Sequence, residues 1–311
     1  MSQLPPEHND ARKGTESPPP FICKVPQTPG PFIFAAPHSG RHYPEAMCRA
    51  TSLSGNELRL SEDAYVDQLF TDVPSSGATL LKATHARAYL DLNRAPDELD
   101  AGMFTPALSP SMAHETYRVK AGLGVIPRVI NDEKVIYSQP LPAREAFFRI
   151  DHFYTPYHEK LQSLLDARRK QFGYAVLIDC HSMPSESGTR RRRVRHVGPE
   201  VVLGDNWGAS CDRSLTSFAE DLLIQAGFNV RRNVPYSGGF TTQHYGNPDV
   251  GIHTLQIEIS RAIYMNEQTL DVLPEFEIIK EKLQWFSNRL IAKFNDFYPK
   301  NTNSALPKAA E

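Results

Sequence analysis

Two histidines in this chain follow apolar runs of the kind that form buried strands. His38 comes directly after the run at 32–37, and His181 comes directly after the run at 174–180. In an open α/β sheet the carboxyl ends of parallel strands meet at one edge, and ligands bind there. We therefore expect the two imidazoles to lie at the same edge and to offer two nitrogen ligands for a metal ion. The alternative for either histidine alone is a hydrogen-bonded structural side chain.

A metal site of this kind needs a third ligand, and the segment SEDAYVDQLF (61–70) contains two candidates. Zinc is commonly held by two histidines and one carboxylate, with a fourth position open for water. Asp63 and Asp67 are four residues apart, so on a helix they share one face. A helix dipole also favours an acid in the first turn, which gives Asp63 a structural alternative. Spacing leaves both acids open as ligands, and Asp179 is a further carboxylate that can orient a ligand imidazole.

An acid inside a third apolar run is a candidate general base. Glu258 lies in TLQIEI (254–259), and Gln256 lies two residues earlier on the same face. Charged side chains are rarely buried unless they are paired or functional. A carboxyl group in a dry cleft has a raised pKa and can accept a proton near neutral pH. The structural alternative is an ion pair between Glu258 and Arg261.

Polar residues also alternate with leucines in AYLDLN (88–93), which we expect to be a strand. The side chains of Asp91 and Asn93 should then face away from the core side. Arg94 follows, and a guanidinium at a strand end can form a bidentate contact with a substrate carboxylate. The glycine-rich stretch 235–246 suits close approach of another group to its backbone, with an ordinary turn as the alternative.

The elements that carry these residues alternate between short apolar runs and longer amphipathic segments. This pattern predicts one α/β domain with a mostly parallel mixed sheet and helices on both faces. We expect a helix after Ser61, which is a plausible N-cap, and a helix at 144–171 that Pro156 interrupts. The stretch 100–142 is rich in Pro, Gly and Ser and should cross the surface as a long excursion. The expected strands are 32–37, 78–83, 88–93, 174–180, 201–205, 229–234 and 254–259, and the other expected helices are 212–226 and 273–297.

Length and composition limit the class of protein. The chain has 311 residues, 40% of them hydrophobic, and a formal net charge of −2, which gives no argument for nucleic acid or a membrane surface. No apolar stretch reaches the roughly 20 residues that span a bilayer, and the N-terminus lacks the apolar core of a secretory signal. We therefore expect a cytoplasmic protein. Residues 1–22 should form a disordered Pro-rich arm, 23–298 a catalytic domain and 299–311 a flexible tail.

Seven short motifs occur in order between about residues 31 and 298: PHSG, EDAYVDQLF, YLDLNR, DCHSM, LGDNWGASC, NVPYSGGFTTQHYG and LQIEISRAIYM. Together they resemble the N-formylglutamate amidohydrolase family. The resemblance implies a fold like that of the zinc carboxypeptidases. It also implies a metal-dependent hydrolase that releases formate and glutamate from N-formyl-L-glutamate in histidine breakdown.

The resemblance also implies roles for particular residues. His38 and His181 match the family's metal-ligand histidines, and Asp63 is favoured over Asp67 as the acidic ligand of one zinc ion. Glu258 matches the position of a general base, which would take a proton from water and pass it to the leaving amine.

Arg94 and Arg261 match family arginines that receive the carboxylates of the substrate, and Asn93 joins them as a substrate-binding candidate. The Pro-rich arm and the loop TRRRRVRH (189–196) fall outside the family pattern and leave the exact substrate open. A zinc deacylase or peptidase with another small N-acyl substrate is the first alternative. The second is a polyanion-binding protein that uses Arg190–Arg193, which the slightly negative net charge and the lack of interleaved aromatic residues disfavour.

Overall fold

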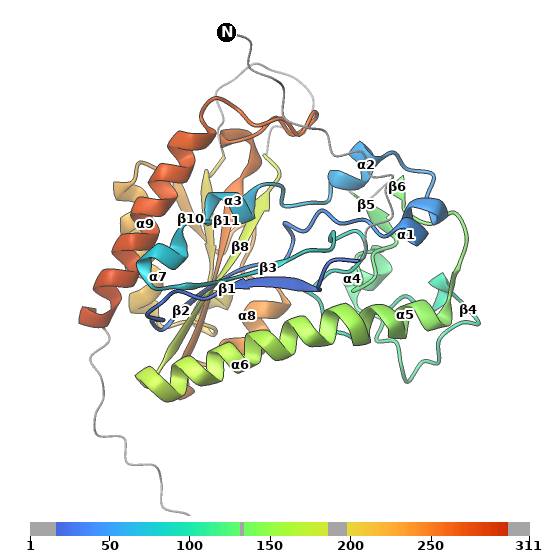
Figure 1. Ribbon diagram of the computed structural model, residues 1–311, viewed down its shortest axis with the longest axis horizontal. Coiled ribbons are helices and arrows are strands. Elements are labelled where there is room, and N and C mark those ends of the chain that lie inside the picture. Colours follow the sequence, from blue (N-terminus) through green and yellow to red (C-terminus); the bar gives the residue numbers. More distant parts are fainter. Residues whose placement is uncertain (1–16, 131–133, 186–197, 298–311) are drawn as a thin grey trace, which may run out of the picture.

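A seven-stranded mixed sheet forms the centre of the computed structural model, which describes residues 17–130, 134–185 and 198–297 (Figure 1). The strand order is β1-β3-β2-β8-β11-β9-β10. The central strands from β3 to β11 run parallel, whereas β1 pairs antiparallel with β3 and β9 pairs antiparallel with β11. The strands are β1 (Phe21–Lys24), β2 (Phe32–Ala36), β3 (Thr79–Ala83), β8 (Ala175–Met183), β9 (Val201–Gly204), β10 (Val230–Arg232) and β11 (Ile252–Ser260).

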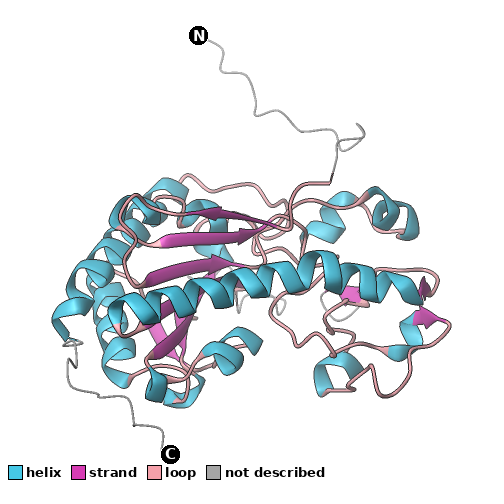
Figure 2. Cartoon of the chain, turned by 60° about the horizontal axis from the view of Figure 1, so that its bottom comes forward, coloured by secondary structure: helices cyan, strands magenta, loops and turns pink. Residues whose placement is uncertain are grey.

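Helices cover both faces of this sheet (Figures 1 and 2). One face packs against α3 (Val66–Leu69), α7 (Arg213–Gln225) and α9 (Phe276–Phe297), which share one apolar core with it. The other face packs against α6 (Thr155–Phe172) and α8 (Phe240–Tyr245), where a second apolar core lies. The prediction of a single α/β domain with a mostly parallel sheet and helices on both faces is confirmed.

The two-residue period of the strands explains where polar groups leave the core. In β8, Ile178 and Cys180 belong to the first apolar core, and Leu177 on the opposite face belongs to the second. Asp179 and His181 continue that second face, because alternate strand residues point to the same side. β11 repeats this pattern beside β8. The second core therefore ends in a group of buried polar side chains at the carboxyl edge of the parallel strands.

The stretch 100–142 is an excursion, as predicted, and lies beside the sheet rather than in it (Figure 1). A long helical rod runs from this excursion to the sheet (Figure 2). The rod consists of α5 (Ala143–Arg149), a π-helical segment (Ile150–Tyr154) and α6. The interruption lies next to Pro156, as predicted, because proline has no amide hydrogen to donate. The short elements of the excursion are β4 (Phe104–Thr105), α4 (Tyr117–Lys120), β5 (Val129–Ile130), β6 (Lys134–Val135), β7 (Leu141–Pro142) and a 3₁₀ turn (Ala101–Met103).

The expected strand at 88–93 is wrong. Residues 86–90 form a turn in which the amides of Tyr89 and Leu90 both donate to the carbonyl of Ala86, and the amide of Asp91 donates to the carbonyl of Val125 in the excursion. The backbone groups are thus satisfied locally and by the excursion, so this segment has no need of a neighbouring strand. Its alternating leucines reflect packing into the second core.

The helix expected to start after Ser61 is also misplaced. Two short helices, α1 (Glu45–Ala50) and α2 (Gly55–Arg59), precede this position, and α3 begins only at Val66. The amide of Asp63 donates to the carbonyl of His38 at 3.0 Å. This tertiary hydrogen bond keeps Asp63 in an irregular turn and out of the helix.

The boundary of the expected N-terminal arm needs one correction, because Phe21 and Ile22 belong to β1 and pair with β3. The first sixteen residues of that arm, the expected tail 299–311 and the loop 189–196 lie outside the described residues. No helix among the residues described is long and apolar enough to cross a membrane.

Candidate active site

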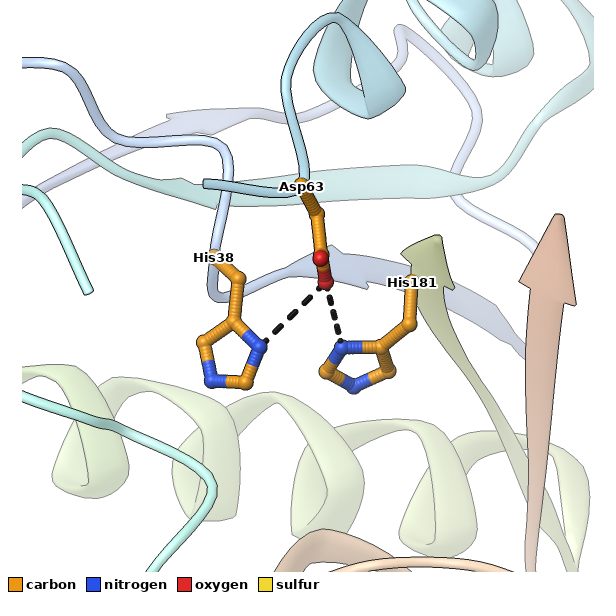
Figure 3. A group of neighbouring side chains, drawn as sticks. All are labelled: His38, Asp63 and His181. Carbon is orange, nitrogen blue, oxygen red and sulfur yellow. Dashed lines mark hydrogen bonds and ion pairs between the residues drawn. The ribbon is translucent and has the colours of Figure 1, made fainter. Parts of the chain in front are cut away.

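His38, Asp63 and His181 meet at the carboxyl edge of the sheet (Figure 3). His38 extends from the turn after β2, His181 from the end of β8, and Asp63 from the turn before α3. Asp63 Oδ2 lies 3.3 Å from His38 Nδ1 and 3.0 Å from His181 Nδ1. One ligand atom from each of the three residues lies within 4.8 Å of the others. The structure thus brings together the three residues that the sequence singled out.

Two further carboxylates fix the orientation of the histidine rings. Asp91 Oδ1 lies 2.7 Å from His38 Nε2, and Asp179 Oδ2 lies 2.9 Å from His181 Nε2. All four side chains are buried. A carboxylate behind an imidazole fixes its tautomer and makes the other ring nitrogen a better ligand. Both Nδ1 atoms are therefore directed at Asp63.

The three donor groups fit a metal ion. His38 Nδ1 is buried and has no hydrogen-bond partner in the described part of the chain. A tetrahedral zinc site with bonds of about 2.0–2.1 Å has ligand atoms about 3.3 Å apart. The two distances from Asp63 Oδ2 to the Nδ1 atoms, 3.0 and 3.3 Å, are close to that separation. One ligand atom from each residue lies within 4.8 Å of the others, so the three groups are close enough to share one divalent ion.

Asp63 is itself held in place from the other side. Arg261 Nη2 donates to Asp63 Oδ1 at 2.9 Å, and Ser182 Oγ donates to the same oxygen at 3.3 Å. Burial raises the pKa of Asp63, but the hydrogen bond from His181 and the charges of the nearby His38 and Arg261 outweigh it and hold the pKa well below its usual range. Asp63 is therefore an ionised carboxylate at neutral pH, as a metal ligand must be.

Asp67, the other candidate acid, lies away from the histidines. Its carboxylate forms ion pairs with Arg41 at 2.6 Å and with Lys82 at 2.8 Å. The irregular backbone before α3 separates the directions of the two acids, so the shared helix face expected from their spacing does not exist. Of the two acids, Asp63 alone belongs to the histidine cluster.

Glu258 occupies the strand next to His181. The two residues are register partners in the parallel pair β8–β11, as are Asp179 and Gln256. Gln256 Nε2 donates to Glu258 Oε1 at 2.7 Å, and Gly239 N donates to Gln256 Oε1 at 2.8 Å. Burial raises the pKa of Glu258 to about 7, despite the opposing charge of His181. This carboxyl group can both accept and donate a proton near neutral pH.

The expected alternative for Glu258, an ion pair with Arg261, is wrong. Arg261 directs its donors elsewhere: Nε to Ser182 Oγ at 3.1 Å, Nη1 to the carbonyl of Leu60 at 3.2 Å, and Nη2 to Asp63. Arg261 lines the pocket, and one of these contacts holds the carboxylate of Asp63.

A cavity of about 560 Å³ opens over these groups, large enough for a small-molecule substrate. His38, Asp63, His181, Glu258 and Arg261 line one end of it. The excursion 100–142 and the glycine-rich stretch 235–246 form other parts of the wall. The long excursion therefore contributes to the wall of the site, and long segments of this kind are often functional.

Asn93 and Arg94 also line this pocket, where both make contacts with the protein itself. Asn93 Oδ1 accepts from the amide of Thr241 at 2.8 Å, and Asn93 Nδ2 lies 3.3 Å from His181 Nε2. A Cβ atom on Gly239 would meet Asn93 Nδ2 at 2.4 Å, so the close backbone approach expected for this loop occurs. Arg94 Nε donates to the carbonyl of Leu123, and its Nη1 donates to the carbonyl of Asn93.

Side chains of the helical rod hold the segment 89–94, which carries Asp91, in place. Arg149 donates to one carbonyl of this segment at 3.1 Å, His158 Nε2 lies 3.1 Å from a second, and Tyr154 donates to a third at 2.7 Å. These bonds and the contact with the excursion replace the strand ladder that the sequence predicts. The position of Asp91, and with it that of the His38 ring, depends on the rod.

Two residues of the site, Asp91 and Arg87, have no predicted role in it from the sequence. Arg87 Nε donates to Asp91 Oδ2 at 2.9 Å, and Arg87 lines the pocket. Burial raises the pKa of Asp91, but the charges of Arg87 and Arg94 and the neighbouring His38 hold it well below its usual range. The spacing of Arg87 and Asp91, four residues apart, is a local signal for this pair. Nothing local connects the pair to His38.

An α/β sheet with two oriented imidazoles and a carboxylate at its carboxyl edge, beside a carboxyl group whose pKa is about 7, defines an enzyme site of hydrolytic type that can hold a metal ion. The family model of N-formylglutamate amidohydrolase matches residues 30–265. Because this match spans most of the chain, the chain belongs to the N-formylglutamate amidohydrolase family.

Individual relatives agree with this assignment. The N-formylglutamate deformylases of Pseudomonas aeruginosa and Pseudomonas putida are 29% identical to the chain over 245 and 244 residues. Each match covers 76% of this chain, and 83% and 82% of the respective relatives. The crystal structure of N-formylglutamate amidohydrolase from Ralstonia eutropha JMP134 has 30% sequence identity and a TM-score of 0.83, and the match covers 90% of this chain and 99% of that chain.

Proposed function

We propose that this chain is a zinc-dependent amidohydrolase that hydrolyses N-formyl-L-glutamate to formate and glutamate. The family assignment supports the reaction, and the cluster of His38, Asp63 and His181 supports the dependence on a metal ion. The observation that carries the proposal is the orientation of both Nδ1 atoms toward one ionised carboxylate, with Asp91 and Asp179 behind the rings.

The donor set supports zinc in particular. Two imidazole nitrogens and one carboxylate oxygen suit zinc better than magnesium or calcium, which prefer sites built of oxygen ligands. The chemistry that a zinc ion supplies at such a site is Lewis acidity, which activates water near neutral pH and polarises a carbonyl oxygen. Asp91 and Asp179 would keep the two rings oriented for it, and Arg261 would hold Asp63.

Glu258 is the proposed general base. Its carboxylate would take a proton from the attacking water and pass it to the amide nitrogen as the C–N bond breaks. The products are then formate and glutamate with a free amino group. Burial raises its pKa toward neutrality, to about 7 in the metal-free site, and this direction suits both proton transfers, because the carboxylate form accepts and the acid form donates. Gln256 orients the carboxyl group through its 2.7 Å hydrogen bond.

The charge of the pocket supports an acidic substrate. Its wall contains four arginines and three acids, and Glu258, one of those acids, is neutral part of the time near pH 7. A divalent ion would add two positive charges. N-formylglutamate carries two carboxylates, so its negative charge complements the excess of positive charge in the pocket. Asn93, Arg94 and Arg261 remain predicted substrate-binding residues, although each already makes contacts within the protein.

Metal analysis combined with a substrate panel tests the proposal. The purified protein should contain about one zinc ion and release formate from N-formyl-L-glutamate, and chelation followed by zinc should remove and restore the activity. N-acetyl-L-glutamate and a small dipeptide test the alternative of another deacylase or peptidase. If the protein hydrolyses one of these compounds and releases no formate from N-formyl-L-glutamate, the proposed substrate is wrong and the alternative holds. Polyanion binding through Arg190–Arg193 stays a prediction, since that loop lies outside the described residues.

A further inference from the structure

Arg118 is a cation in the pocket wall that the site chemistry described above does not use. It belongs to α4 in the excursion and lines the cavity. In the part of the chain that the structure describes, its guanidinium has neither a hydrogen bond nor an ion pair. The guanidinium carbon lies 5.4 Å from the centre of the Tyr117 ring, a cation–π contact that limits its freedom.

The helix that carries Arg118 is anchored to the site. Buried Glu98 accepts hydrogen bonds from the amide of Ala95 at 2.9 Å and from the hydroxyl of Thr116 at 2.8 Å. Thr116 is the N-cap of α4, so one carboxylate connects this helix to the residue after Arg94. Arg94 Nε donates to the carbonyl that follows α4 at Leu123. The backbone that carries Arg118 is therefore anchored to the segment that carries Arg94.

Arg118 and Arg94 both line the cavity, so two guanidinium groups face the same space. Burial lowers the pKa of Arg94, and the charges of Arg87 and Arg118 lower it further, against the opposing charges of Asp91 and Glu98. Asp91 is already engaged by His38 at 2.7 Å and by Arg87 at 2.9 Å, and its distance to Arg94 is 3.7 Å. An anion beside two guanidinium groups relieves their repulsion and accepts their planar forks of donors. This end of the pocket suits a carboxylate.

We propose that Arg118 binds the side-chain carboxylate of the substrate and sets the preference for an acidic amino acid. This inference rests on the proposed function. Arg261 contacts Asp63 at 2.9 Å and Arg94 lies 3.7 Å from Asp91, whereas Arg118 has no hydrogen bond or ion pair with the site residues in the described part of the chain. The γ-carboxylate of N-formylglutamate is two bonds farther from the formyl carbon than the α-carboxylate. The more distant cation therefore matches the more distant charge.

A comparison of N-formyl-L-glutamate with N-formyl-L-glutamine isolates this contact, because the two substrates differ only at the γ position. Arg118→Ala should lower the ratio of kcat/KM for N-formyl-L-glutamate to kcat/KM for N-formyl-L-glutamine by about 10- to 100-fold. This is the effect of losing one charge-assisted hydrogen-bonded contact. The loss should come from a higher KM for N-formyl-L-glutamate, with a much smaller change for the amide. Arg118→Lys should restore part of the ratio, because it keeps the charge and loses the fork.

Lys120→Ala is the matched control. Lys120 lies on the same helix, and its ammonium pairs with Glu115 at 3.4 Å instead of lining the pocket. This variant should keep the wild-type ratio. An Arg118→Ala enzyme that keeps the ratio would overturn the proposal. So would a loss of preference for the α-carboxylate alone, measured with N-formyl-L-isoglutamine.

Calorimetric binding of L-glutamate and L-glutamine separates this inference from the proposed function, since it needs no turnover. Wild-type protein should bind glutamate more tightly, and Arg118→Ala should lose that preference. If the preference depends on Arg118 but no formyl substrate is hydrolysed, the proposed reaction fails and the acidic subsite stands. Equal preferences in the two proteins would refute the subsite whether or not the reaction occurs.

Discussion

Glu258 and His181 are register partners on the neighbouring parallel strands β11 and β8. Neighbouring strands lie about 4.8 Å apart, so the sheet fixes the separation between the candidate base and a candidate metal ligand. Two residues earlier, Gln256 and Asp179 are partners in the same way. Each of these two residues contacts the site residue two positions later on its own strand: Gln256 donates to Glu258, and Asp179 contacts His181. The adjacent strands β8 and β11 thus supply one candidate metal ligand and the candidate base, each with the side chain that orients it.

The pH dependence of hydrolysis should have an acid limb set by Glu258. Burial raises its pKa from 4.5 to about 7. A base must be ionised, so kcat/KM should fall as the pH drops through this pKa. A bound divalent ion favours the carboxylate and moves the midpoint to a value between these two. A profile measured from pH 4 to 9 checks this, and a flat acid limb down to pH 4 would contradict the role of Glu258.

Metal binding should release a proton from His181. Burial lowers the pKa of this imidazole, but the charge of Asp179 outweighs burial and raises the pKa well above its ordinary value. The metal-free protein therefore carries a proton there at neutral pH, and a ligand histidine must be neutral. The apparent zinc affinity should fall by about tenfold per pH unit below that pKa. Calorimetry of zinc binding at pH 6, 7 and 8 measures it, and a constant affinity would be inconsistent with this ligand.

Asp63→Asn should abolish stable metal binding, because the amide is a poor ligand and leaves Arg261 buried without its carboxylate. Asp67→Asn is the matched control four residues away. It breaks the ion pairs with Arg41 and Lys82 and should cost about 1–3 kcal/mol of unfolding free energy while the metal content stays at wild-type level. Elemental analysis and urea unfolding distinguish the two. Metal loss in Asp67→Asn alone would show that the wrong acid has been assigned.

Tyr154→Phe tests whether the helical rod positions the segment that carries Asp91. The change removes a buried hydrogen bond of 2.7 Å to the carbonyl of Arg94, so it should cost about 1–2 kcal/mol of unfolding free energy and reduce zinc affinity. Tyr157→Phe is the control, since its buried hydroxyl has no partner in the described part of the chain. It should leave both quantities near wild type. Equal effects of the two changes on zinc affinity would argue against positioning by Tyr154.

The sequence predicts the parts of the site that local patterns control. The apolar runs before His38 and His181 identify the strand ends, and the two-residue period places Glu258 on the face of Gln256. These inferences need only the geometry of a single strand. The family resemblance added the choice of Asp63 over Asp67, which their spacing left open.

The remainder depends on contacts between distant segments. Residues 88–93 have the alternation of a strand, yet hydrogen bonds from the helical rod and the excursion hold them in an irregular path. Asp63 leaves the expected helix because its amide bonds to the carbonyl of His38. Arg118 joins the pocket wall through the anchoring of α4 by Glu98. No period or spacing in the chain encodes these three relationships.

Glu258→Gln gives the most direct test of the proposed mechanism, because the amide keeps the shape and can still accept from Gln256 but cannot take a proton. The variant should retain zinc and bind substrate, while kcat falls by about 10²–10⁴-fold. Loss of zinc together with loss of activity would instead indicate that Glu258 is a metal ligand. The measurement is kcat for formate release from N-formyl-L-glutamate by folded, zinc-loaded Glu258→Gln: the account predicts a collapse of that rate, and a near-normal rate would contradict it.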